Sequence, residues 1–86
     1  MINNALFKRF LSSTTDTIIY DLKTNPQKGL KKLSGLINRF AKHSIRDDLL
    51  NALESNSDLI VDLANSIDHD TIKTFIFNMV YNPPFD

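Results

Sequence analysis

Residues 25–42 read NPQKGLKKLSGLINRFAK, and this stretch decides the fold. Asn25 is a preferred helix N-cap and Pro26 suits the first helical position, so a helix is predicted to begin here and to run to about Lys42. Its apolar side chains lie within about 140° of one another on a helical wheel, which is typical of a helix that covers a core. They are Leu30, Leu33, Leu36, Ile37, Phe40 and Ala41. Gly29 lies on the same side and is expected to let a second helix approach closely.

The rest of the chain predicts four further helices and no strand. Apolar residues recur at helical spacing in residues 3–23, 45–54, 58–66 and 70–81. Ser44 with Asp47 has the pattern of a capping box, residues 55–58 repeat a capping signal, and Asp68 suits the N-cap of the last helix. We therefore expect an all-α fold, a small irregular bundle of about five helices in a single domain covering residues 1–86. Residues 82–86 are expected to form a linker-like tail that leads to a following domain.

The first helix is long and has one weak point. Its expected inner face is Phe7, Leu11, Thr14, Ile18 and Leu22. Between Ser12 and Thr15 the hydroxyl side chains compete for backbone groups, so one helix with a kink there is predicted. The alternative is a second helix capped by Ser13 and Asp16. The predicted core of the bundle is Leu22, Leu30, Leu33, Leu36, Ile37, Phe40, Leu49, Leu53, Leu63, Ile72, Phe75 and Met79.

Composition excludes several classes of site. The chain has no cysteine, which removes disulfides, thiolate metal sites and thiol nucleophiles, and agrees with a reducing compartment. The first residues lack the basic start and long apolar run of a signal peptide. No apolar run approaches the ~20 residues of a membrane span. We therefore expect a cytoplasmic protein with no membrane partner.

The zero net charge hides an asymmetry. Residues 1–46 carry nine Lys and Arg against Asp16 and Asp21, whereas residues 47–86 carry Lys73 alone against eight acids. Either the two halves complement each other or are simply solvated, or the first half offers an anion-binding face. The candidate anion-binding residues, opposite the apolar side of the second helix, are Lys28, Lys31, Lys32, Arg39 and Lys42. Asp47 and Asp48 open the next helix and would repel phosphates, which argues against nucleic acid.

No catalytic constellation is recognisable. His43 is placed at the end of the second helix, where the helix dipole would favour its protonated form. Asp68, His69 and Asp70 are consecutive, so their side chains cannot converge on one metal ion, and capping explains them better. The carboxylate pairs are Asp47 with Asp48 and Asp58 with Asp62. Capping or an exposed position explains each pair, so we predict no catalytic, cofactor or metal site, and no enzyme activity for these residues.

The last helix carries more apolar surface than one core face needs. Its first stripe is Ile72, Phe75, Ile76, Met79 and Val80. Phe77 and Tyr81 form a second stripe, and the two cover roughly 240° where ~100° would suffice. The predicted contact surface is Phe77, Tyr81, Pro83, Pro84 and Phe85. It would meet a following domain, another protein or a second copy of the chain. The alternative is that Phe77 and Tyr81 fold back onto the first helix.

Two segments resemble a known family. Residues 25–33, NPQKGLKKL, are similar to the stretch DPEKNLPKLL that precedes the catalytic domain in a group of radical S-adenosylmethionine proteins, and residues 67–78, IDHDTIKTFIFN, resemble their VDPEVRKTFFENF. The resemblance covers roughly residues 20–82 and implies an N-terminal helical accessory domain. In that family a following barrel holds S-adenosylmethionine and a four-iron cluster through three cysteines. This chain has no cysteine, so no cluster ligand carries over, and both cofactors are expected only if such a domain follows.

These observations predict a non-catalytic accessory or docking domain that packs on a catalytic domain or a partner protein through its last helix. One alternative is a stand-alone interaction module that homodimerises. Another is an anion or nucleic-acid binder that uses the basic side of the second helix.

Overall fold

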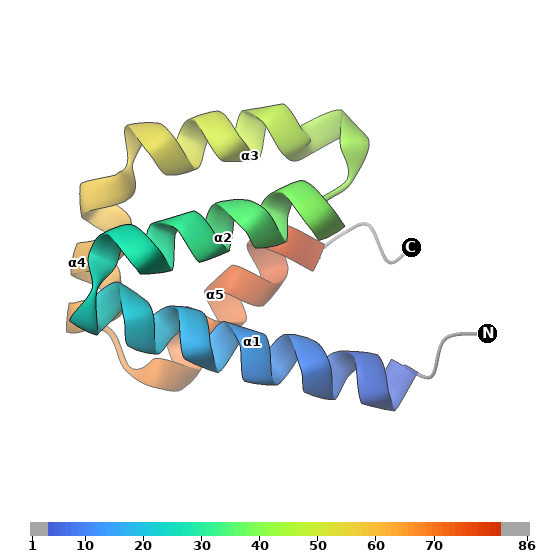
Figure 1. Ribbon diagram of the computed structural model, residues 1–86, viewed down its shortest axis with the longest axis horizontal. Coiled ribbons are helices and arrows are strands. Elements are labelled where there is room, and N and C mark those ends of the chain that lie inside the picture. The colour runs from blue at the N-terminus through green and yellow to red at the C-terminus, as the bar shows by residue number, and fades with distance from the viewer. Residues whose placement is uncertain (1–3, 82–86) are drawn as a thin grey trace.

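The chain folds into helices packed around one core, as the sequence predicts (Figure 1). The computed structural model describes residues 4–81, with the side chains of Leu6 and of residues 9–80. The helices are α1 (Asn4–Thr24), α2 (Pro26–Phe40), α3 (His43–Ser55), α4 (Ser57–Ser66) and α5 (His69–Tyr81). The described residues contain no strand. In Figure 1, α1 and α2 run antiparallel, α3 lies along α2, the short α4 turns the chain back, and α5 passes behind the α1–α2 pair.

The helices α1 and α2 approach each other closely at Gly29. A Cβ added to Gly29 would lie 2.6 Å from the backbone nitrogen of Leu22 and 2.8 Å from its Cα. Contacts this short are not tolerated, so only glycine allows α2 to lie this close to α1. The expectation of a close approach at Gly29 is confirmed.

A single residue, Asn25, connects these two helices. Its backbone N–H donates to the Asp21 carbonyl (2.7 Å) and closes α1, and its carbonyl accepts from the Gly29 N–H (3.1 Å) and opens α2. The Asn25 side chain makes no cap hydrogen bond, so the predicted side-chain cap is wrong. The reason is geometric: its ψ of 82° belongs to a residue shared by two helices rather than to an extended N-cap.

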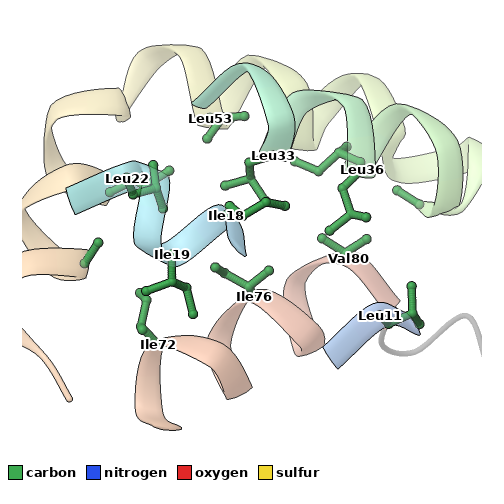
Figure 2. Packing of buried hydrophobic residues seen from close by; sticks show 14 residues of the cluster. Leu11, Ile18, Ile19, Leu22, Leu33, Leu36, Leu53, Ile72, Ile76 and Val80 are labelled. Atoms are coloured by element: carbon green, nitrogen blue, oxygen red, sulfur yellow. The ribbon is translucent and has the colours of Figure 1, made fainter. Parts of the chain in front are cut away.

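The core gathers side chains from all five helices. Figure 2 shows Ile72, Ile76 and Val80 of α5 pointing at Ile19 and Ile18 of α1 and at Leu36 of α2. The buried apolar residues are Leu11, Ile18, Ile19, Leu22, Leu33, Leu36, Ile37, Ala41, Leu53, Ile60, Ala64, Ile72, Ile76 and Val80. Of the predicted core, Leu30, Phe40, Leu49, Leu63 and Met79 are partly buried against this cluster. The α5 helix thus completes a core that α1 and α2 begin.

Phe75 was predicted in the core, and this is wrong, because it is 46% exposed. The residues of α5 that face the core are Ile72, Ile76 and Val80. The buried side of the helix is therefore rotated toward Phe77 relative to the predicted apolar stripe. Phe77 is accordingly half-buried and packs against the core.

A similar rotation affects α1, where Thr15 rather than Thr14 is fully buried and Ile19 joins the core. The Thr15 hydroxyl donates to the Leu11 carbonyl (2.7 Å), which satisfies it inside the core. The helix continues through Ser12 to Thr15 without a second start, so the alternative of a new helix is wrong, while the kink stays a prediction.

Two other helix starts differ from expectation. Lys42 occupies the N-cap of α3, and its carbonyl accepts from the Ile45 and Arg46 N–H groups, so the Ser44 capping box is wrong. The extended backbone of Ala41 and Lys42 ends the turn early. As a result α2 stops at Phe40, and His43 opens α3 instead of closing α2.

The start of α4 has no side-chain cap either. Its N-cap, Asn56, donates from its side-chain amide to the Ala52 carbonyl (2.8 Å) and so caps the end of α3. Asp68 is the predicted cap that is confirmed: its carboxylate accepts from the Thr71 N–H (3.0 Å) and the Thr71 hydroxyl (2.8 Å).

The packing predicts opposite outcomes for two Leu→Ala changes. Leu36 is 5% exposed and faces α5, so Leu36→Ala should lower the free energy of unfolding by ~2–5 kcal/mol. Leu59 is 54% exposed, so the matched change Leu59→Ala should cost less than about 1 kcal/mol. Urea denaturation followed by circular dichroism measures both. If both variants lost less than about 1 kcal/mol of the free energy of unfolding, the side of α2 that carries Leu36 would not face the core.

Candidate functional site

The five basic residues predicted to bind anions all lie on exposed positions, but they do not form one site. Lys28 and Lys31 line a groove between α2 and α3 with a volume of about 890 Å³. Lys32 and Arg39 line a second groove, between α1 and α2, of about 600 Å³. Lys42 lines neither groove. Glu54 also lines the first groove, so its negative charge partly offsets the positive charges of Lys28 and Lys31.

One of these cations already has a partner. Lys32 Nζ lies 2.7 Å from Oδ2 of Asp21, a carboxylate that is buried where α1 ends. This oxygen is buried and has no aligned hydrogen bond, so the ammonium charge of Lys32 is what compensates it. Lys32 therefore serves the α1–α2 junction, and it is less available to a ligand than Arg39.

The predicted contact surface on α5 is only partly visible. Phe77 is half-buried against the core. The side chain of Tyr81 and residues Pro83, Pro84 and Phe85 lie outside the described part of the chain. Phe75, which sequence reasoning placed inside, is exposed. Met79 lies one turn further along the same side of α5 and is partly buried. We call these two residues the Phe75–Met79 flank.

A polar cluster that the sequence did not predict links α1 to the start of α5. His69 Nε2 lies 2.6 Å and Lys73 Nζ 3.0 Å from the same oxygen, Oδ1 of Asp16. Because a carboxylate only accepts hydrogen bonds, the Nε2 nitrogen of His69 carries the proton. The hydrogen bond from His69, followed by that from Lys73, lowers the pKa of the Asp16 carboxyl. Asp16 and His69 are 53 residues apart, so no local pattern could have revealed the contact.

The cluster is suited to holding two helices together rather than to chemistry. Both Asp16 and His69 are nearly half exposed, so water competes for their charges. Asp68 keeps its capping role, and the hydrogen bonds from the hydroxyl and backbone N–H of Thr71 lower its pKa. Among the described residues, no group of three or more His, Cys, Asp or Glu side chains is placed to hold a metal ion.

The net charges of the two halves would suggest ion pairs between cations of residues 1–46 and acids of residues 47–86. The observed ion pairs differ from this pattern. In the part of the chain that the structure describes, Lys32 pairs with Asp21 inside the first half, and Lys73 of the second half pairs with Asp16 of the first. The excess cations of α2 therefore face outward. None of the helices in this part of the chain is long and apolar enough to cross a membrane.

Comparison with known proteins finds no matching family model, no matching curated protein and no matching solved structure.

The Asp16 cluster predicts a pH-dependent contribution to stability. Asp16→Asn should lower the free energy of unfolding at neutral pH by up to about 1 kcal/mol, since the pair is half exposed. Because folding lowers the pKa of Asp16, the contribution is complete above the ordinary value of 3.8 and disappears as the pH falls through the lower folded-state value.

Urea denaturation of the wild type and the variant, at neutral pH and well below pH 3.8, measures this difference. Asp62→Asn is the control, because Asp62 is exposed on α4 and has no ion-pair partner among the described residues. A difference for Asp16→Asn that is equally large at both pH values would contradict the ion-pair explanation.

Proposed function

We propose that this chain is a non-catalytic docking domain that packs on a catalytic domain or a partner protein through α5. The proposal rests mainly on Phe75, which is 46% exposed on a helix that already buries another side in the core. Ile72, Ile76 and Val80 are at most 1% exposed. The Phe75–Met79 flank therefore contributes apolar surface that the fold does not need.

Leaving a large aromatic side chain in water gives up stabilisation that burial would provide. Covering apolar surface is worth about 25 cal/mol per Å², and aromatic and methionine side chains are enriched where protein surfaces meet. The side chain of Met79 adapts its shape easily, which suits a docking flank. A partner that covers Phe75 would extend the core of the bundle by one layer.

The resemblance to radical S-adenosylmethionine proteins supports the same direction of docking. In that family the corresponding helix is followed by the catalytic barrel, so α5 would lie next to the junction. S-adenosylmethionine and the iron–sulfur cluster would then be held by the following domain and not by these residues. The cysteine-free composition suits a reducing compartment, and we place the domain in the cytoplasm.

A matched pair of substitutions on α5 tests this proposal. Phe75→Ser should change the free energy of unfolding by less than about 1 kcal/mol, while Phe77→Ser should cost more, because Phe77 packs against the core. Without a partner, the wild-type chain should self-associate or bind the apolar dye 1-anilinonaphthalene-8-sulfonate through α5.

Sedimentation velocity and dye fluorescence measure the second effect. Phe75→Ser should reduce both self-association and dye binding. If Phe75→Ser unfolds the domain, the ring belongs to the core. If association and dye binding are unchanged, the docking flank lies elsewhere, and the proposal fails.

A further inference from the structure

The groove between α1 and α2 lies on a part of the bundle that α5 does not cover. Ile18 and Leu36 lie at the bottom of the α1–α2 groove but are at most 5% exposed. The large apolar side chains that a ligand could reach there are Phe10 on the α1 side and the partly buried Phe40 on the α2 side. Phe10 is 53% exposed. On α1, Phe10 shares its side of the helix with the exposed residues Ser13 and Thr17, away from the inward line of Leu11 and Ile19.

Gly35 lines this groove and is exposed. A Cβ added at Gly35 would meet no atom within 4 Å, whereas one added at Gly29 would collide with Leu22. A mid-helix glycine lowers helix stability, and no packing within the described chain requires one at position 35. The missing side chain leaves room for a second backbone or a bulky side chain to approach α2 at this position. Packing inside the fold therefore explains Gly29 but does not explain Gly35.

The charges that line the groove have one sign. Lys32 and Arg39 are its ionisable residues, and hydroxyl and amide side chains supply the remaining polar groups. Lys32 is paired with Asp21, but Arg39 has no acidic partner among the described residues. A ligand that places a carboxylate beside Arg39 would satisfy it, whereas a basic ligand would be repelled.

The helical walls of the groove favour a helix over an extended peptide as the ligand. Both walls are α-helices, whose mid-helix backbone groups are already hydrogen-bonded, so an extended peptide would find no backbone partner for its own N–H and C=O groups. A helix satisfies its own backbone and presents side chains at positions i, i+4 and i+7 to an apolar groove.

We propose that the α1–α2 groove binds an amphipathic α-helix of a partner protein, with its apolar side over Phe10, Gly35 and Phe40 and with Glu or Asp next to Arg39. This site is separate from the Phe75–Met79 flank, and it goes beyond the docking function proposed for α5. Gly35 allows the partner helix to lie close to α2, in the way that Gly29 allows α1 to do so.

Two synthetic helical peptides test the charge preference. Both carry Leu at i, i+4, i+7 and i+11, and they differ only in having Glu or Lys beside the apolar side. In titrations at low salt the Glu peptide should bind the full chain at least about ten-fold more tightly than the Lys peptide. Its binding should shift the amide NMR signals of Gly35, Thr14 and Thr17. Equal affinities, no binding of the Glu peptide, or shifts confined to other helices would overturn the proposal.

Two variants test the site itself. Gly35→Leu fills the groove without a clash at Cβ, so it should keep the fold and weaken binding of the Glu peptide at least about ten-fold. Asn51→Leu adds the same side chain on the exposed side of α3 and should leave binding unchanged. Arg39→Glu should reverse the preference between the two peptides, and it remains informative if Gly35→Leu does not fold.

Phe75→Ser should not alter binding of the Glu peptide, which separates this site from the one on α5. Binding that survives both Gly35→Leu and Arg39→Glu would show that the groove is not the site.

Discussion

The close approach of α1 and α2 at Gly29 is the constraint on which the rest of this structure depends. It brings the α2 backbone against Leu22, which is fully buried, and a one-residue connection at Asn25 holds the two helices in that position. Once the pair is formed, Leu33 and Leu36 lie beside Ile18, and together they create an apolar surface that α5 covers (Figure 2).

The same contact accounts for the two polar features of the pair. Asp21 is buried in the last turns of α1, and the ammonium group of Lys32 of α2 compensates its charge. On the open side of the pair the helices leave the α1–α2 groove, where Gly35 lacks the neighbour that Gly29 has. A single helix pair therefore sets the core on one side and the candidate binding groove on the other.

Sequence reasoning succeeded where the signal is local and periodic. The apolar side of α2, the helical class of the fold, the Asp68 cap and the role of Gly29 all follow from spacing along one helix. It failed where the neighbouring helix decides. In α5 the core contact involves Phe77 instead of Phe75, and in α1 it involves Thr15 instead of Thr14. Each difference corresponds to a rotation of the helix about its axis by less than a third of a turn, and packing against the neighbouring helices fixes that rotation.

The candidate sites follow the same division. That the basic residues of α2 are exposed could be predicted from the helical wheel. Their separation into two grooves could not, because α1 and α3 determine which of them meet. The contact of His69 and Lys73 with Asp16 joins residues from opposite ends of the chain, and it has no local signature at all. Phe75 and Phe10 are likewise exposed, and only the packed structure separates them from the buried apolar residues.

The most direct test of the central constraint compares alanine at the two glycines. Both changes raise the intrinsic helix propensity of α2 by up to about 1 kcal/mol, so they differ only in what the new methyl group meets. We expect Gly35→Ala to raise the free energy of unfolding by ~0.5–1 kcal/mol and Gly29→Ala to lower it by ~1–3 kcal/mol, since the methyl group would force α1 and α2 apart. Urea denaturation of the two variants and the wild type measures these differences in the free energy of unfolding. A Gly29→Ala protein as stable as the Gly35→Ala protein would contradict the claim that this close approach organises the fold.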